Sequence, residues 1–212
     1  MGITTAWAIT THDDAFVTGL APRMLPLLAA DRDDPVARGR RQRWQREPLP
    51  DFRTWYGHVH GTEQADAIDS FLALTSGGGR MEDMWSAPDS DDAFGVASDV
   101  WEESADTDHM FLSVQSKDFA VASLFHAIGP RRAALLPGWC GNFLLTPTEV
   151  AEALPVVEQA LTFTAQERAA AEEQDWLHYG EDDESVLDGP LRVWRVAAAQ
   201  RLGLCGVALT IY

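Results

Sequence analysis

The sequence predicts an α+β fold: a single domain whose mixed or antiparallel sheet includes both terminal strands and is packed by several helices. Apolar residues alternate with smaller or polar ones over residues 2–10 and again over 205–212, as expected of strands, whose successive side chains point to opposite faces. Between these ends, apolar residues recur at helical spacing, most clearly over residues 147–161. Helices and strands in both halves need one another to bury their apolar faces, so we expect one domain over residues 1–212.

The first third of the chain predicts one strand followed by helices. Thr11 to Asp14 is typical of a helix start, with acidic residues in the first turn. Pro22 and Pro26 follow, and we expect them to divide the next segment into short pieces. Thr62 is a suitable N-cap for a further helix, which the glycines at 77–79 would end.

The clearest local pattern lies in residues 132–161. Two apolar runs separated by Pro137-Gly138 predict a strand, a turn and a second strand. Thr146 to Glu149 then forms a capping box with proline at the first helical position, which begins a helix. Pro155 lies inside that helix and cannot donate a backbone hydrogen bond, so we expect a kink there.

The remaining elements flank this stretch. A strand is predicted over residues 109–114, and Ser116 is expected to cap a helix that Gly129-Pro130 stops. Thr164 to Glu167 is a second capping box and begins a largely exposed helix. The last helix is predicted over residues 188–202, directly before the closing strand.

Charge narrows the classes of partner. The chain has 33 acidic residues against 16 Lys and Arg, a formal net charge of −17. Such a charge repels phosphates and anionic lipid surfaces, so we expect no nucleic acid and no membrane as direct ligand. A basic protein partner is compatible with it, and solubility alone is the alternative explanation of the acidity.

The compartment is predicted to be the cytoplasm. The N-terminus lacks the basic and apolar regions of a secretory signal, and no run approaches the roughly 18 apolar residues of a membrane span. Two cysteines, Cys140 and Cys205, do not make a disulfide framework. Both thiols are therefore expected to be reduced.

Two segments depart from the average composition. Residues 31–53 are rich in arginine, with Trp44 among them. They are either a solvated loop or helix face, or a basic edge that grips an anionic ligand, since guanidinium groups suit phosphate and carboxylate. Residues 82–108 contain ten acids and no base, and are expected to form an acidic loop region with aromatic anchors.

Histidine and cysteine provide the candidates for chemistry. His58 and His60 alternate and would share one face of a strand. No third ligand stands at a fixed local spacing, so no metal and no other cofactor is expected. Cys140 is the candidate nucleophile, with His58 or His60 as its base, although a reactive thiolate needs a cationic neighbour or a helix N-terminus. The alternative for Cys140 is a buried structural role, and whether the chain is an enzyme stays open.

Two segments without Lys or Arg, residues 82–108 and 172–188, each contain tryptophan. Aromatic anchors within a charged rim are typical of tight, fast-associating interfaces. We therefore expect an acidic protein-binding module, such as an immunity or antitoxin-like protein, that neutralises a basic partner. The residues expected to bind that partner are Trp85, Asp89, Asp91, Asp92, Trp101, Glu102, Glu103, Trp176, Glu181, Asp182 and Asp183.

The alternative function is a small-molecule-binding protein or enzyme. Its pocket would be lined by tryptophan and capped by arginine, both of which the chain has in number. The two functions are distinguished by whether the fold contains a concave site or a filled core.

The segment Leu145 to Val150, Leu-Thr-Pro-Thr-Glu-Val, resembles a helix start in bacterial proteins of the DUF1877 (YfbM-like) family. Proteins of that family also open with Met-Gly and a short strand and close on a helix and a strand, as Met1 to Ile3 and Trp194 to Tyr212 do here. Trp55 to His60 is similar to a Trp/His segment in their first half. The family has no established activity, so the resemblance implies a small soluble α+β protein and transfers no catalytic residue.

Overall fold

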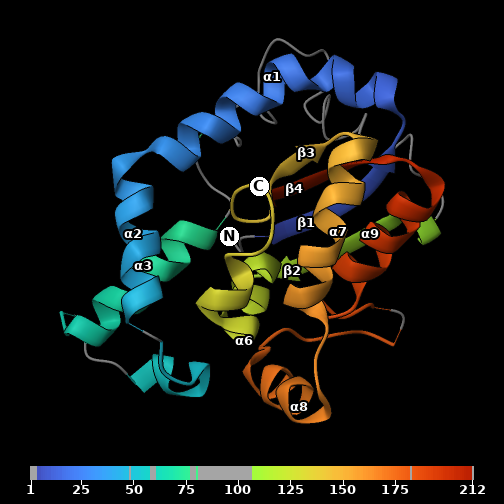
Figure 1. Cartoon of the computed structure of the whole chain (residues 1–212). Coiled ribbons are helices and arrows are strands. Elements are labelled where there is room, and N and C mark those ends of the chain that lie inside the picture. The colour runs from blue at the N-terminus through green and yellow to red at the C-terminus, as the bar shows by residue number, and fades with distance from the viewer. Residues whose placement is uncertain are drawn as a thin grey trace.

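The computed structural model describes residues 4–47, 49–57, 61–76, 80, 107–181 and 183–211. It has the α+β fold that the sequence predicts, with one antiparallel sheet and helices around it (Figure 1). The described strands are β1 (Thr4–His12), β2 (Met110–Ser116), β3 (Phe143–Leu145) and β4 (Gly203–Ile211). The described α-helices are α1 (Asp14–Asp33), α2 (Pro35–Arg46), α3 (Glu63–Thr75), α6 (Ala120–Ala133), α7 (Pro147–Leu161), α8 (Ala165–Gln174) and α9 (Gly189–Gln200).

The two terminal strands form the centre of the sheet. Its order is β2-β1-β4-β3, and every neighbouring pair is antiparallel. Thr4 pairs with Ile211 and His12 with Gly203, so β1 and β4 lie side by side along their whole length. The prediction that both ends of the chain contribute strands to one sheet is confirmed.

Helices α6, α7 and α9 pack on one face of this sheet, and α7 and α9 lie in front of it in Figure 1. On that face the Trp7 ring meets Phe111 edge-on, with centroids 5.4 Å apart, and Phe143 contacts Trp194 of α9 at 5.6 Å. Helix α1 packs on the opposite face, where the sulfur of Met24 lies 4.0 Å from that of Cys205. Both faces of the two central strands are therefore buried.

Helices α2 and α3 extend this core to one side. Trp44 of α2 is buried between Phe71 of α3, at a ring-centroid distance of 5.0 Å, and Phe125 of α6, at 5.9 Å. The arginine-rich segment thus forms a helix that buries its tryptophan and leaves most other side chains exposed or half-buried. This matches the interpretation of that segment as a solvated helix face.

The predicted helix starts are confirmed at three places. Thr62 caps α3, since its side chain accepts a hydrogen bond from the backbone N–H of Ala65. Thr146 and Thr164 each form a complete capping box at the starts of α7 and α8. The break near Gly129 is also found, with φ of 73° inside α6.

Four local predictions were wrong. Helix α1 continues through Pro22 and Pro26, because its buried side chains outweigh the one backbone hydrogen bond that each proline removes. The run before Pro137 ends α6 and turns, and it forms no strand. Ser116 belongs to β2, so α6 begins only at Ala120. Helix α9 ends at Gln200 and not at residue 202, because Arg201 takes a left-handed conformation with φ of 57°.

Candidate functional site

A cavity of about 490 Å³ opens between the 3₁₀ helix η1 (Phe52–Gly57), helix α3, the start of α6 and the chain that follows α8. This volume lies within the roughly 300–1,000 Å³ typical of small-molecule pockets. Its apolar lining combines two leucines, Leu72 and Leu177, with four aromatic side chains, Phe52, Trp55, Phe119 and Trp176.

The aromatic walls come from segments far apart in the sequence. Trp176 follows α8 and contacts Trp55 of η1, with ring centroids 5.1 Å apart and planes inclined by 59°. Phe52 packs on the same Trp176 ring at 5.8 Å. The two tryptophans touch each other, so they form one continuous aromatic surface, against which a ligand can lie but between which it cannot insert.

His126 of α6 contacts both segments that carry the aromatic walls, the one with Trp55 and the one with Trp176. Its Nε2 lies 3.2 Å from the carbonyl oxygen of Pro50, and its Nδ1 lies 3.4 Å from that of Gln174. The ring also stands edge-on to Trp55, at 5.0 Å. Burial lowers the pKa of His126, while the two carbonyl groups and the charge of Asp51 oppose this effect. His126 thus links α6 to the segment before η1 and to the last residue of α8.

Asp175 fixes the position of the Trp176 segment. Its carboxylate accepts hydrogen bonds from the Ser123 hydroxyl of α6 at 2.7 Å, from the Tyr179 hydroxyl at 2.5 Å and from the backbone N–H of Leu177 at 3.1 Å. The backbone N–H of Trp176 in turn donates to the Ser123 hydroxyl at 3.1 Å. The wall that carries Trp176 is therefore held to α6 by a connected hydrogen-bond network.

Charged and polar residues also line the cavity. Lys117 and Asp118 occupy the connection between β2 and α6, and His178 lies in the chain after α8. Lys117 has φ of 69°, a left-handed conformation uncommon for a residue with a side chain. Burial raises the pKa of Asp118, and the charge of His178 acts in the opposite direction. The Thr5 hydroxyl donates to the backbone carbonyl of Asp118 at 2.6 Å and holds this connection to β1.

A second hollow lies beside Cys140, but it measures only about 30 Å³, room for about one water molecule. Arg41 lines it together with Cys140. Burial raises the pKa of the Cys140 thiol to about 12, although the charge of Arg41 opposes this. The thiolate is the nucleophilic form of cysteine, so this environment favours the structural interpretation of Cys140 over the catalytic one.

Only part of the sequence-predicted site falls where the structure can be described. Trp176 lies in the wall of the cavity, Glu181 is exposed, and Asp183 accepts a hydrogen bond from the backbone N–H of Gly180. The other predicted site residues lie outside the described residues: His58, His60, Trp85, Asp89, Asp91, Asp92, Trp101, Glu102, Glu103 and Asp182.

The acidic segment over residues 172–188 is partly neutralised by arginines from the helices beside it. Arg168 pairs with Glu172 at 2.6 Å and with Asp188 at 2.5 Å, and Arg192 pairs with Glu184 at 2.7 Å. These contacts reduce the negative charge that the segment presents to a partner. The protein-binding hypothesis therefore stays a prediction that draws mainly on residues 82–108.

Sequence reasoning did not predict Phe52, Leu72, Phe119 or Lys117 as site residues. The signal was weak, because these residues are far apart in the sequence and share no spacing. The left-handed backbone at Lys117 is visible only in the structure, since neither glycine nor asparagine marks that position.

No grouping of three His, Cys, Asp or Glu side chains suited to a metal ion occurs in the part of the chain that the structure describes. Within the same ranges, no helix has both the length and the apolar composition needed to cross a bilayer. Comparisons with models of protein families, with curated proteins and with solved structures found no match to this chain. The resemblance to the DUF1877 family thus stays an expectation drawn from the residues that carry it.

Proposed function

We propose that this protein binds a small organic molecule with a planar, apolar body in the cavity beside Trp55 and Trp176. The observation that carries the proposal is the cavity itself, which combines about 490 Å³ with four aromatic lining residues. Such a volume suits a ligand of one or two rings, and a concave, largely apolar wall with a few polar groups is typical of small-molecule sites. This is the second of the two functions that the sequence predicts.

The way the walls are held supports this proposal. His126 and the Asp175 network attach both walls to α6 through contacts within the chain. These contacts order the walls before any ligand binds. A site that is already ordered binds its ligand more tightly than one that must become ordered on binding. The cavity departs from the expected Trp/Arg pocket in one respect: among its described lining residues, Lys117 is the cation.

The experiment fills the cavity with a larger side chain. Leu72 of α3 lines the cavity, so Leu72→Trp should occupy part of its volume. The matched control is Leu25→Trp, which places the same side chain at an exposed position of α1, 45% accessible. The probe is the neutral 1-naphthaleneacetamide, whose dissociation constant is measured by ligand-observed NMR titration and by calorimetry.

We expect the original chain and Leu25→Trp to bind this probe equally, and Leu72→Trp to bind it about tenfold more weakly, a difference of about 1.4 kcal/mol. Far-ultraviolet circular dichroism of all three proteins shows whether the fold is retained. Equal affinity in the folded Leu72→Trp protein, or no binding of the probe to the original chain, would refute the proposal.

A further inference from the structure

Two acidic residues line the cavity, Asp118 and Asp175, and their carboxylates differ in their hydrogen bonds. The carboxylate of Asp175 is engaged by Ser123, Leu177 and Tyr179, which leaves little capacity for a ligand. Within the described ranges, no hydrogen bond or ion pair to the carboxylate of Asp118 is found, although its charge interacts with that of His178. A half-buried carboxylate without hydrogen-bond donors is poorly solvated, which is the reason for its raised pKa.

The place of Asp118 in the fold is fixed. It follows Lys117, whose left-handed backbone turns the chain out of β2, and its own carbonyl accepts the hydrogen bond from Thr5. Phe119, the next residue, lines the cavity and precedes the first turn of α6. Asp118 is therefore held in the lining of an aromatic cavity by backbone contacts that involve no ligand.

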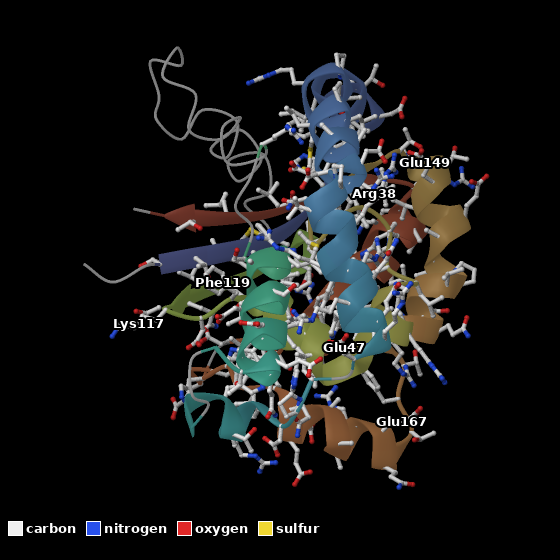
Figure 2. All side chains as sticks on the ribbon, turned by 90° about the vertical axis from the view of Figure 1, so that its left-hand side faces the viewer. Arg38, Glu47, Lys117, Phe119, Glu149 and Glu167 are labelled. Atoms are coloured by element: carbon white, nitrogen blue, oxygen red, sulfur yellow. The ribbon has the colours of Figure 1, made fainter. Side chains whose placement is uncertain are left out.

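Lys117 does not act as a counter-ion for the carboxylate of Asp118. Its side chain is exposed, and Figure 2 shows it extending outward from the end of β2. Among the described residues, the charge that acts on the Asp118 carboxyl is that of His178, and no ion pair joins Asp118 to Lys117. A cationic group of a ligand would thus meet a carboxylate that forms no ion pair with a described residue.

The aromatic lining also favours a positively charged ligand. The faces of indole and phenyl rings carry negative potential and attract a cation placed over them. Phe52, Trp55, Phe119 and Trp176 line the same cavity as Asp118. The net charge of −17 also raises the concentration of cations around the molecule.

We propose that the cavity selects organic cations, namely amines joined to a planar apolar body, with Asp118 as the residue that receives the ammonium group. This inference rests on the proposed function and adds the charge of the ligand to it. The apolar body lies on the surface formed by Trp55 and Trp176, and the ammonium group lies toward the β2–α6 connection.

The test uses three probes with the same ring and different charge: 1-(2-aminoethyl)naphthalene, 1-naphthaleneacetamide and 1-naphthaleneacetate. We expect the amine to bind about tenfold more tightly than the amide, and the acetate to bind most weakly, because a charge-assisted hydrogen bond contributes roughly this much. Asp118→Asn, which keeps the shape of the side chain, should weaken binding of the amine about tenfold and change that of the amide less than about twofold.

The control variant is Glu152→Gln, which removes one negative charge from an exposed position of α7. It should leave all three affinities unchanged if the amine is bound by Asp118 and not by the overall field. Unchanged binding of the amide to Asp118→Asn also shows that this variant keeps its cavity.

The outcomes separate the two proposals. Suppose that the amide binds, that Leu72→Trp weakens its binding, and that the amine binds no more tightly than the amide. The proposed function then stands, and the selection of cations is wrong. If the acetate binds most tightly and Lys117→Gln abolishes that preference, the cavity selects anions and the inference is overturned. If none of the three probes binds, the proposed function fails, and this inference fails with it.

Discussion

At the scale of single residues, burial of His12 makes stability depend on pH. His12 lies at the end of β1, where its ring stacks on Phe16 at 3.8 Å and its Nε2 is 2.7 Å from the Thr10 hydroxyl. Burial lowers the pKa of His12 to about 4, so the ring is neutral in the folded protein at neutral pH. An unfolded histidine titrates near 6.5, and the unfolded chain therefore binds one more proton between about pH 4 and 6.5.

Stability is predicted to fall as pH is lowered through this window. The folded pKa of His12 lies below the unfolded value, so its contribution is fully present above about pH 6.5 and is lost as pH falls toward 4. The free energy of unfolding should decrease on the order of 3 kcal/mol from this group. Urea unfolding at several pH values measures the slope for the original chain and for His12→Gln, in which the slope should be shallower.

Val157→Ala is the control for this measurement. It removes buried volume from α7, where Val157 is fully buried, and should lower stability by a similar amount at every pH. The same pH slope in His12→Gln as in the original chain would show that His12 is not the titrating group.

The turn at Cys140 shows how far single residues could be predicted. The sequence indicates a turn at Pro137-Gly138, and Cys140 lies on a tight turn just after it, where Trp139 and Asn142 exchange two backbone hydrogen bonds. Cys140 and Gly141 both have positive φ, at 45° and 84°, as a type I′ hairpin turn requires. A Cβ at Gly141 would lie 2.5 Å from a methyl group of Val121, so this glycine is needed for packing on α6 as well. That contact joins distant residues, and no local pattern indicates it.

At the scale of elements, Asp175 determines how the connection between α8 and α9 is held. Replacing it by alanine removes the acceptor for Ser123, Leu177 and Tyr179 at once. We predict that Asp175→Ala lowers the free energy of unfolding by about 2 kcal/mol, since hydrogen bonds to charged groups contribute about 1.5–3 kcal/mol each and the site is only half-buried. Chemical denaturation measures the loss, and hydrogen exchange should show faster exchange of the Leu177 amide.

The matched control is Glu173→Ala, two residues earlier on the exposed side of α8. It should change stability by less than about 0.5 kcal/mol, as surface substitutions usually do. Asp175→Ala and Glu173→Ala proteins of equal stability would mean that the network does not hold the wall of the cavity.

The elements differ in how well the sequence predicts them. Capping boxes at Thr146 and Thr164 are local signals, because all their contacts lie within one helical turn, and both are found in the structure. Pro22 and Pro26 are also local signals, yet α1 continues through them. Its buried residues pack against β3 and β4, and this long-range packing outweighs the local preference.

At the scale of the whole molecule, alternation of side chains predicts the terminal strands but not their order. The arrangement β2-β1-β4-β3 depends on pairings between residues up to 207 positions apart, such as Thr4 with Ile211. The cavity is a further consequence of this topology, since it brings together Phe52, Phe119 and Trp176. Composition indicates that enough tryptophan is present for such a site, but only the fold shows which of them line it.

The overall charge predicts how salt affects the whole fold. Acidic residues outnumber Lys and Arg by 33 to 16, and the excess repels itself more strongly in the compact state than in the unfolded chain. The ion pairs of the described chain, such as Arg195 with Glu158 at 2.9 Å, are exposed or half-buried, and each contributes about 0–1 kcal/mol. Salt screens both the repulsion and the ion pairs. The screening length shortens from about 30 Å at 0.01 M to about 8 Å at 0.15 M. Because the repulsion acts over longer distances than the ion pairs, salt weakens it more.

We therefore predict that the melting temperature at neutral pH rises by a few degrees between about 0.01 M and 0.3 M sodium chloride. This rise corresponds to an increase in the free energy of unfolding on the order of 1 kcal/mol. Differential scanning calorimetry measures the rise, and Glu152→Lys should make it smaller, because it lowers the net negative charge by two at an exposed position. A melting temperature that falls with salt would instead mean that the local ion pairs outweigh the excess charge. A rise produced by calcium far beyond that of sodium at equal ionic strength would point to specific binding of the cation, because screening depends on ionic strength alone.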